Sequence, residues 1–326
     1  MECYISQDYF PKLEELLTSA KDDILTERAT NLNVLFQLLS ALPLNIDLKD
    51  LDIKKFAKSL VGNKTYTSFK DRIIINAIKN QKLKTCHLEG LETKINNLSA
   101  FYFFNSDDAS EFSITKGIVC KGLDYKGNSF YDDCTVADLP INKGWELVKD
   151  TIPPTNAMLI VDQYLFSIPN QERKLQNLIE FIELYKGKLE IPFHLSILFS
   201  ATNRYNELCS PLYIQQAFQK LSEIPNTKIQ LFIHNYIPRH DRLIFTNYTS
   251  GNIGIPFDDR ETRFTQNFLG RENSSAKILR NYRNYENDLI FWYTFLNNIP
   301  YNIGNVQTKW ESSKFTNRLF EPFLVS

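Results

Sequence analysis

Three short apolar segments, separated by two amphipathic helix patterns, constrain the fold of this chain more than any other feature. The apolar segments cover residues 158–162, 193–199 and 228–233, and the helix patterns cover residues 171–185 and a stretch that opens at Ser210 and Pro211. The apolar segments recur about every 35 residues, and Ser before Pro is a common N-cap and first-turn pair. This alternation predicts a βαβαβ unit with parallel strands and right-handed crossovers.

The carboxyl ends of such strands are the usual place for a binding site in a parallel sheet. In this sequence they fall at Asp162, at residues 200–203 and at residues 234–240. Two interpretations stay open for Asp162. It is either a group that holds a ligand or metal at the sheet edge, or a carboxylate that caps the loop before Tyr164 through an Asx-type turn.

Further elements are predicted after the third strand. A β-hairpin is expected from residues 242–246 and 252–255, joined by the turn-forming residues 247–251. A helix is expected at residues 274–296, where apolar side chains recur at helical spacing. The predicted sheet is therefore mixed.

The first half of the chain has weaker signals. Helix patterns cover residues 13–42 and 48–61, and residues 65–99 fit a buried strand or a short helix equally well. β-type segments follow at residues 101–104 and 112–119. These patterns predict a helical and mixed α+β unit.

A double proline, Pro153 and Pro154, stands in a polar stretch that resists regular structure. It predicts two domains, 1–150 and 151–326, in a chain long enough for two cores. The expected fold class is α/β, with a C-terminal mixed sheet built on a βαβαβ core and an N-terminal helical and mixed α+β unit.

Composition limits the cellular environment and the classes of partner that we expect for this chain. The formal net charge of -1 argues against wholesale coating of nucleic acid, so that any basic surface must be local. No apolar run reaches membrane-spanning length and the start lacks a secretory pattern, which predicts a cytoplasmic protein without a membrane partner. The five cysteines are scattered and never paired as C-x-x-C, so reduced thiols are expected, with no metal site and no cofactor.

Two of the four histidines, His234 and His240, lie close together before the predicted hairpin. With the strand that ends at Asp162, this segment resembles the phospholipase D-like superfamily over residues 158–257. Catalytic members of that superfamily carry a His-x-Lys motif followed by four residues and Asp, and two copies build one phosphodiesterase site.

The motif in this chain departs from that pattern. His240 is kept, but Arg242 stands in place of lysine and Asn247 in place of aspartate. Arginine can still hold a phosphate through its forked guanidinium, whereas a neutral amide cannot replace a carboxylate that orients and stabilises a charged imidazole. No second copy exists in the sequence, so only a homodimer would bring two motifs together. The resemblance therefore favours the non-catalytic branch.

Three interpretations of His240 stay open: a structural histidine that fixes its loop, an anion-binding group, or the catalytic histidine of a dimeric site. Between residues 260 and 283, basic residues alternate with aromatic ones, a pattern that grips phosphates and stacks bases. Interspersed carboxylates make a solvated face with local ion pairs the alternative. The candidate binding residues are Asp162, Arg239, Arg242, Asn247, Arg260, Arg263, Arg280 and Arg283.

The expected function is a non-catalytic module that recognises a protein or nucleic-acid partner bearing phosphate. One alternative is a phosphodiesterase or nuclease with a dimeric single-motif site, and another is a structural subunit of a larger assembly. An accessory role in a prokaryotic antiviral defence system is a further hypothesis, which no residue pattern specifies.

Overall fold

The computed structural model divides into two compact units, each formed by several stretches of chain. The first unit comprises residues 1–114, 118–131 and 269–283, and the second comprises residues 115–117, 132–268 and 284–326. The structure describes residues 1–6, 9, 11, 27–47, 69–80, 83–86, 97–104, 109–121, 134–139, 145, 148–166, 171–200, 210–238, 242–253, 262–270, 272, 274–303 and 306–324.

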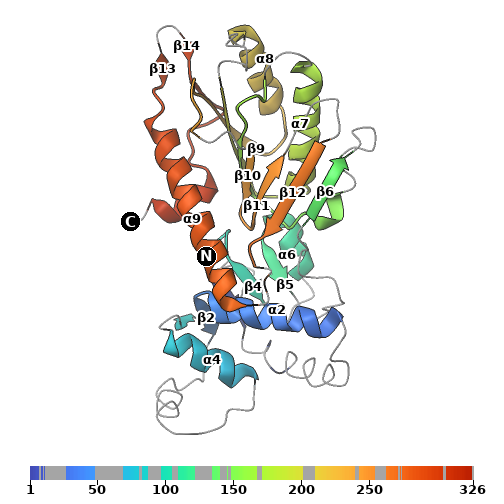
Figure 1. The fold of residues 1–326 in the computed structure, drawn as a ribbon, viewed down its shortest axis with the longest axis vertical. Helices are drawn as coiled ribbons and strands as arrows, with labels where there is room; N and C mark the ends of the chain where they lie inside the picture. The colour runs from blue at the N-terminus through green and yellow to red at the C-terminus, as the bar shows by residue number, and fades with distance from the viewer. Residues whose placement is uncertain are drawn as a thin grey trace. The chain divides into compact units, whose positions relative to one another are not determined.

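A parallel five-stranded sheet lies at the centre of the first unit (Figure 1). Its strands, in the order β3-β2-β1-β4-β5, are β1 (Cys3–Ile5), β2 (Leu44–Asp47), β3 (Leu83–Cys86), β4 (Phe101–Phe103) and β5 (Val119–Lys121). Among the described residues, α2 (Glu27–Ala41) lies between β1 and β2 in the chain, α4 (Phe69–Lys79) between β2 and β3, and α6 (Ala109–Lys116) between β4 and β5.

The first unit is therefore an α/β unit, and the prediction of a mixed α+β arrangement is wrong for the described residues. Its strands are so short that they do not show the alternation that identifies a strand in a sequence. Residues 112–116, predicted as strand, are helical in α6. That helix ends where Gly117 takes a φ of +59°, a conformation in which glycine commonly terminates a helix.

The helices predicted in the first half of the chain are confirmed only where the structure describes them. Residues 73–78, which fitted either a strand or a helix, are helical in α4. The predicted helix at 13–42 is confirmed from Glu27 onward by α2. The remainder of that helix, and the helix predicted at 48–61, lie outside the described residues.

An eight-stranded mixed sheet lies at the centre of the second unit. Its strands β7 (Ala157–Val161), β8 (Phe193–Phe199) and β9 (Thr227–Ile233) are parallel neighbours. They are connected by α7 (Gln171–Lys186) and α8 (Pro211–Ser222). The predicted parallel strands and connecting helices of the βαβαβ unit are confirmed.

Antiparallel strands complete this sheet in the order β15-β9-β8-β7-β10-β11-β12-β6. The added strands are β6 (Cys134–Leu139), β10 (Leu243–Thr246), β11 (Thr249–Ile253), β12 (Thr262–Phe268) and β15 (Lys309–Glu311). Because β6 pairs with β12, residues that the boundary near 150 assigns to the first domain belong to the sheet of the second unit.

The predicted hairpin is confirmed as β10 and β11, but its connection is shorter than expected. Only Asn247 and Tyr248 separate the two strands, and Gly251 lies within β11. A Cβ atom on Gly251 would lie 2.4 Å from the carbonyl oxygen of Thr265. This glycine is therefore required by the close approach of β12 rather than by a turn.

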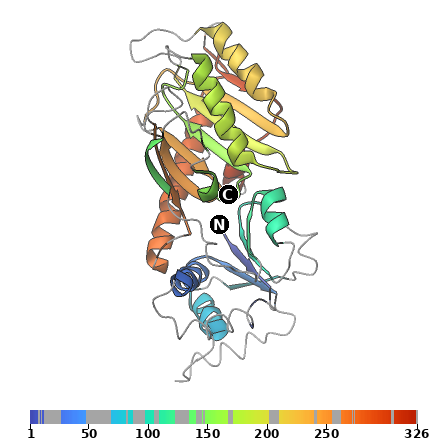
Figure 2. The ribbon, with the colours of Figure 1, turned by 90° about the vertical axis from the view of Figure 1, so that its right-hand side faces the viewer.

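Helices cover both faces of this sheet (Figures 1 and 2). On one face, α7 and α8 pack in a core with alternate strand residues such as Ile160, Ile197 and Ile244. On the other face, the Phe245 ring lies 6.1 Å from Tyr285 of α9 (Ser275–Asn298). Successive residues of a strand point to opposite faces, so β10 contacts both layers. The other elements that the structure describes are β13 (Asn302–Ile303), β14 (Val306–Gln307) and the 3₁₀ helix η2 (Arg318–Phe323).

Buried polar contacts hold η2 against the amino ends of the parallel strands. The Nη1 atom of Arg318 donates to the carbonyl and side-chain oxygens of Asn156, both at 3.0 Å, and to the carbonyl oxygen of Pro192 at 3.3 Å. The backbone N–H of Arg318 donates to Nδ1 of His194 at 3.1 Å. Burial, together with the charges of Arg318 and Lys228, lowers the pKa of His194 to about 3.

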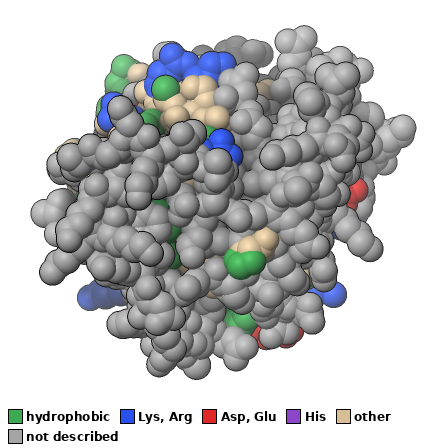
Figure 3. All heavy atoms as spheres, turned by 90° about the horizontal axis from the view of Figure 1, so that it is seen from below, with side chains coloured by type: hydrophobic (Ala, Val, Ile, Leu, Met, Phe, Trp, Pro, Cys, Tyr) green, Lys and Arg blue, Asp and Glu red, His purple; other side chains and the backbone are tan. Residues whose placement is uncertain are grey.

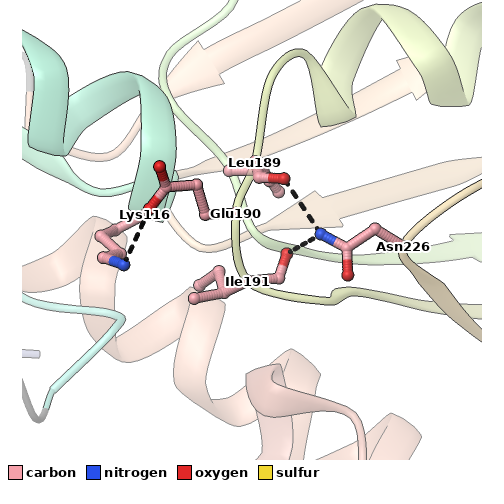
Figure 4. Close-up of polar contacts among 5 residues, drawn as sticks. All are labelled: Lys116, Leu189, Glu190, Ile191 and Asn226. Atoms are coloured by element: carbon pink, nitrogen blue, oxygen red, sulfur yellow. Dashed lines mark hydrogen bonds and ion pairs between the residues drawn. The ribbon is translucent and has the colours of Figure 1, made fainter.

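The loops at this end are joined by side-chain contacts (Figure 4). Asn226 takes a φ of +53°, and its Nδ2 atom donates to the carbonyl oxygens of Leu189 at 3.0 Å and Ile191 at 2.9 Å. Lys116 forms an ion pair with Glu190 at 3.3 Å. The loop before β8 is thus fixed by residues distant in the sequence.

Candidate functional site

Asp162 lies directly after β7 and is buried, with 1% of its surface exposed. Its backbone N–H donates to the carbonyl oxygen of Leu198, which continues the pairing of β7 with β8. Its Oδ1 atom accepts a hydrogen bond from the backbone N–H of Tyr164 at 2.9 Å. This contact is the Asx-type turn that was one of the two interpretations of Asp162.

Arg242 lies beside this carboxylate because β10 runs antiparallel to β7. The pairing of Leu243 with Val161 brings the residue before β10 next to the residue after β7. The Nε atom of Arg242 is 3.5 Å from Oδ1 of Asp162. The guanidinium carbon lies 5.6 Å from the centre of the Tyr164 ring, within the range of a cation–π contact. The side chain of Arg242 keeps 23% of its surface exposed, so it remains accessible to a ligand.

Opposing effects act on the pKa of the Asp162 carboxyl group. Burial raises its pKa to about 6, although Arg242, the Tyr164 hydrogen bond and Lys174 each lower it. Its Oδ2 atom is buried and has no hydrogen-bond partner among the described residues. The site therefore combines one buried carboxylate with two cationic side chains, Arg242 and the buried Lys174 of α7.

The neighbouring strand ends carry Ser200 and His234. Ser200, buried after β8, donates its backbone N–H to the carbonyl oxygen of Gln163 at 3.3 Å. The Nδ1 atom of His234, after β9, lies 2.5 Å from the carbonyl oxygen and 3.2 Å from the backbone nitrogen of Tyr236. Its ring packs edge-on against Phe295 of α9, with 5.1 Å between centroids. The His234 ring is thus engaged by its own loop and by α9.

Asn247 lies away from this site, at the opposite end of β10. It is buried, and its Oδ1 atom accepts hydrogen bonds from the backbone N–H groups of Asn156 and Ala157, each at 3.0 Å. The Asn247 amide therefore fixes the start of β7. It does not lie beside Arg242, as a shared binding role would require.

The other predicted site residues are distributed more widely. Arg239, His240 and Arg260 lie outside the described residues, and Arg263 lies on β12. Arg280 and Arg283 have exposed side chains on α9. They belong to the first unit, as does the nearby ion pair of Lys277 with Glu272 at 3.6 Å. On the face shown in Figure 3, the described Lys and Arg side chains form small separate groups.

The sheet of the first unit has a second edge at which ligands commonly bind in this kind of fold. The strand order reverses between β1 and β4, and open parallel sheets commonly bind ligands at the carboxyl ends beside such a reversal. Ser6, after β1, donates its backbone N–H to the carbonyl oxygen of Phe103 at 2.9 Å. Residues 105–108, which follow β4 in the chain, lie outside the described residues. Because the sequence pattern predicted a mixed α+β unit for this half, it did not indicate a binding site at this sheet edge.

Sequence reasoning identified Asp162 and Arg242 but missed Lys174 and the Tyr164 ring. Lys174 lies in the first turn of α7, the helix that follows β7 in the chain. Because sites in parallel sheets lie at the carboxyl ends of strands, this position in the sequence could have indicated that Lys174 belongs to the site. A lysine on a helix is normally interpreted as solvent-exposed, so its burial is a property of the packing.

Among the described residues, no cluster of three or more His, Cys, Asp or Glu side chains is placed to hold a metal ion. Within the same residues, no helix has the length and apolar character needed to cross a membrane. Cys3 and Cys120 are buried and form no disulfide with each other or with another described residue. No family model matches the chain, and no curated protein matches it.

Proposed function

We propose that this chain is a non-catalytic binding module that recognises a phosphate-bearing partner at the carboxyl ends of β7 and β8. The observation that carries the proposal is the grouping of Arg242 and Lys174 around the buried Asp162. A partly exposed guanidinium in such a place is suited to a phosphate, which it can contact through two oxygens.

The geometry favours binding over the phosphodiesterase alternative. Turnover by the resembled mechanism needs a second histidine to protonate the leaving group. Among the histidines that the structure describes, His194 is held by Arg318 at the amino ends of the strands, and His234 is engaged by Tyr236 and Phe295. His87 and His240 lie outside the described residues. A dimer that pairs two copies of His240 would supply the missing group, and so the enzyme alternative predicts a homodimer.

Binding of the purified protein to labelled phosphate-bearing ligands tests the proposal. Single-stranded and duplex oligonucleotides form one arm and phosphopeptides form the other, each measured at low and moderate salt. Arg242→Ala is expected to weaken binding and to reduce its salt dependence, because one phosphate contact is lost. Lys188→Ala is the matched control, since it removes one exposed positive charge after α7 at the amino end of β8.

Equal binding by Arg242→Ala and the unmodified protein would contradict the proposal. Cleavage of the oligonucleotide that His240→Ala abolishes would replace it with the phosphodiesterase alternative. Tight association with another protein, without any phosphate dependence, would favour the structural-subunit alternative.

A further inference from the structure

Two exposed tyrosines lie at the carboxyl end of β9, on the same edge of the sheet as the Asp162 and Arg242 pair. Tyr236 is 62% exposed and Tyr301 is 56% exposed. Exposed aromatic rings on the same sheet edge as a cationic group offer faces on which a ligand can stack.

Backbone contacts bring the segments of both tyrosines to the end of β9. Tyr236 follows Ile233, the last residue of the strand, after only two intervening residues. The backbone N–H of Ile233 donates to the carbonyl oxygen of Thr308 at 2.9 Å. The backbone N–H of Thr308 donates to the carbonyl oxygen of Tyr301 at 3.1 Å. The segment after α9 is therefore tied to the end of β9.

α9 adds a further tie at this end. Phe295, in the last turn of α9, packs against His234, while Tyr301 follows the end of the helix. In Figure 1, α9 ends beside the β13–β14 hairpin, which begins directly after Tyr301. The two exposed rings thus project from segments that are anchored to the sheet and to the helix.

The spacing of the strands relates these rings to the cationic site. β8 separates β9 from β7, and neighbouring strands lie about 4.8 Å apart, so the two carboxyl ends are about 10 Å apart. The edge carries a cation beside the end of β7, Tyr236 two strands away at the end of β9, and Tyr301 farther out, beyond the Thr308 segment that bonds to the end of β9. These groups provide both contacts that single-stranded nucleic acid uses. The cation holds the phosphate backbone, and the rings stack on unpaired bases.

We infer that the phosphate-bearing partner is a single-stranded nucleic acid, whose backbone contacts Arg242 while its bases stack on Tyr236 and Tyr301. This inference rests on the proposed function and specifies its partner. A duplex keeps its bases stacked on one another and presents no free base face to the two rings. The module should therefore prefer single strands over duplexes of the same sequence.

Fluorescence anisotropy with labelled single-stranded DNA and RNA, and with the corresponding duplexes, tests the inference. Tyr236→Ala and Tyr301→Ala are each expected to weaken single-strand binding by about tenfold and to leave the weaker duplex binding unchanged. Tyr236→Phe and Tyr301→Phe keep the ring and should bind as the unmodified protein does. Ile290→Ala removes another exposed apolar side chain, 44% exposed on α9, and serves as the surface control.

The outcomes separate this inference from the proposed function. If single strands and duplexes bind equally, and only Arg242→Ala weakens both, the inference is overturned and phosphate recognition stands. Binding of phosphopeptides in place of oligonucleotides, dependent on Arg242, has the same meaning. If no phosphate-bearing ligand depends on Arg242, both fall. Thermal unfolding of each variant checks that a loss of binding is not a loss of fold.

Discussion

The side-chain oxygen of Asn247 accepts the backbone N–H of Asn156, 91 positions earlier in the chain, at a distance of 3.0 Å. The same oxygen accepts the N–H of Ala157, so one amide fixes the first residues of β7. The resemblance drawn from the sequence would place Asn247 at the motif aspartate. In the structure, its oxygen holds the start of β7.

Asn247→Ala should therefore destabilise the fold without changing the binding site. The substitution leaves two buried N–H groups without an acceptor, which should lower the free energy of unfolding by about 2–4 kcal/mol. Chemical denaturation measures this loss, and ligand binding below the unfolding transition should match that of the unmodified protein. A variant that unfolds normally but binds more weakly would show that Asn247 belongs to the site.

Sequence periodicity predicted the parallel strands of the second unit because they are buried apolar runs, but it did not predict β6, β12 or β15. β8 and β9 have seven residues each, and every residue of β8 is buried, so the strand stands out as a continuous apolar run. The strands of the first unit have no such length. Their identity depends on pairing with strands distant in the sequence, such as β1 with β2 and β4, which no local pattern records.

The candidate site was predictable in part for a similar reason. Asp162 was identified because it directly follows a predicted strand. Its ion pair with Arg242 depends on the antiparallel placement of β10 beside β7, which brings together residues 80 positions apart. The hairpin was predicted, but its neighbour in the sheet was not. The fold therefore supplies the contact that turns two separately predicted residues into one site.

Asn226 stabilises the fold through its side-chain hydrogen bonds and through its tolerance of a positive φ, and two substitutions separate these contributions to the free energy of unfolding. Its φ of +53° is strained for most residues, and its Nδ2 atom holds the carbonyl oxygens of Leu189 and Ile191 (Figure 4). Asn226→Gly should lose only the side-chain bonds, at a cost of about 1–2 kcal/mol. Asn226→Ala should lose the bonds and add about 1 kcal/mol of backbone strain.

Thermal or chemical unfolding of the two Asn226 variants measures the difference. If the alanine variant is as stable as the glycine variant, the left-handed conformation carries no cost and the interpretation is wrong. Gly187 is a useful reference, because it also has a positive φ of +53°, and a Cβ atom at this position would have no neighbouring atom within 4 Å. Gly187→Ala should thus report the cost of the conformation alone.

His194 should make the second unit sensitive to acid. The unfolded chain protonates this histidine near its ordinary pKa of about 6.5, whereas the folded protein holds its pKa down to about 3. Its contribution to stability is therefore fully present above pH 6.5 and is lost as the pH falls toward 3. At pH 5 the loss should be about 2 kcal/mol relative to pH 8.

His194→Asn provides the control for that pH dependence. Asparagine does not titrate, and its Oδ1 atom can accept the backbone N–H of Arg318 in place of Nδ1. The difference in unfolding free energy between the two proteins should shrink by about 2 kcal/mol from pH 8 to pH 5. A constant difference across this range would show that the histidine is protonated in the folded state as readily as in the unfolded one.

Asp162 should limit anion binding at neutral pH, because its charge opposes a phosphate beside Arg242. Burial raises the pKa of this carboxyl to about 6, so the carboxylate gains a proton as the pH falls through 6 while a phosphodiester stays charged. Binding of an oligonucleotide should therefore strengthen by about threefold to tenfold between pH 7.5 and pH 5.

Asp162→Asn should bind as tightly at pH 7.5 as the unmodified protein does at pH 5, and should lose this part of the pH dependence. The asparagine keeps an oxygen for the Tyr164 N–H, so the turn after β7 is preserved. Affinity that falls in Asp162→Asn, with the fold intact, would mean that the carboxylate itself contacts the ligand through its Oδ2 atom, which has no hydrogen-bond partner in the described part of the chain.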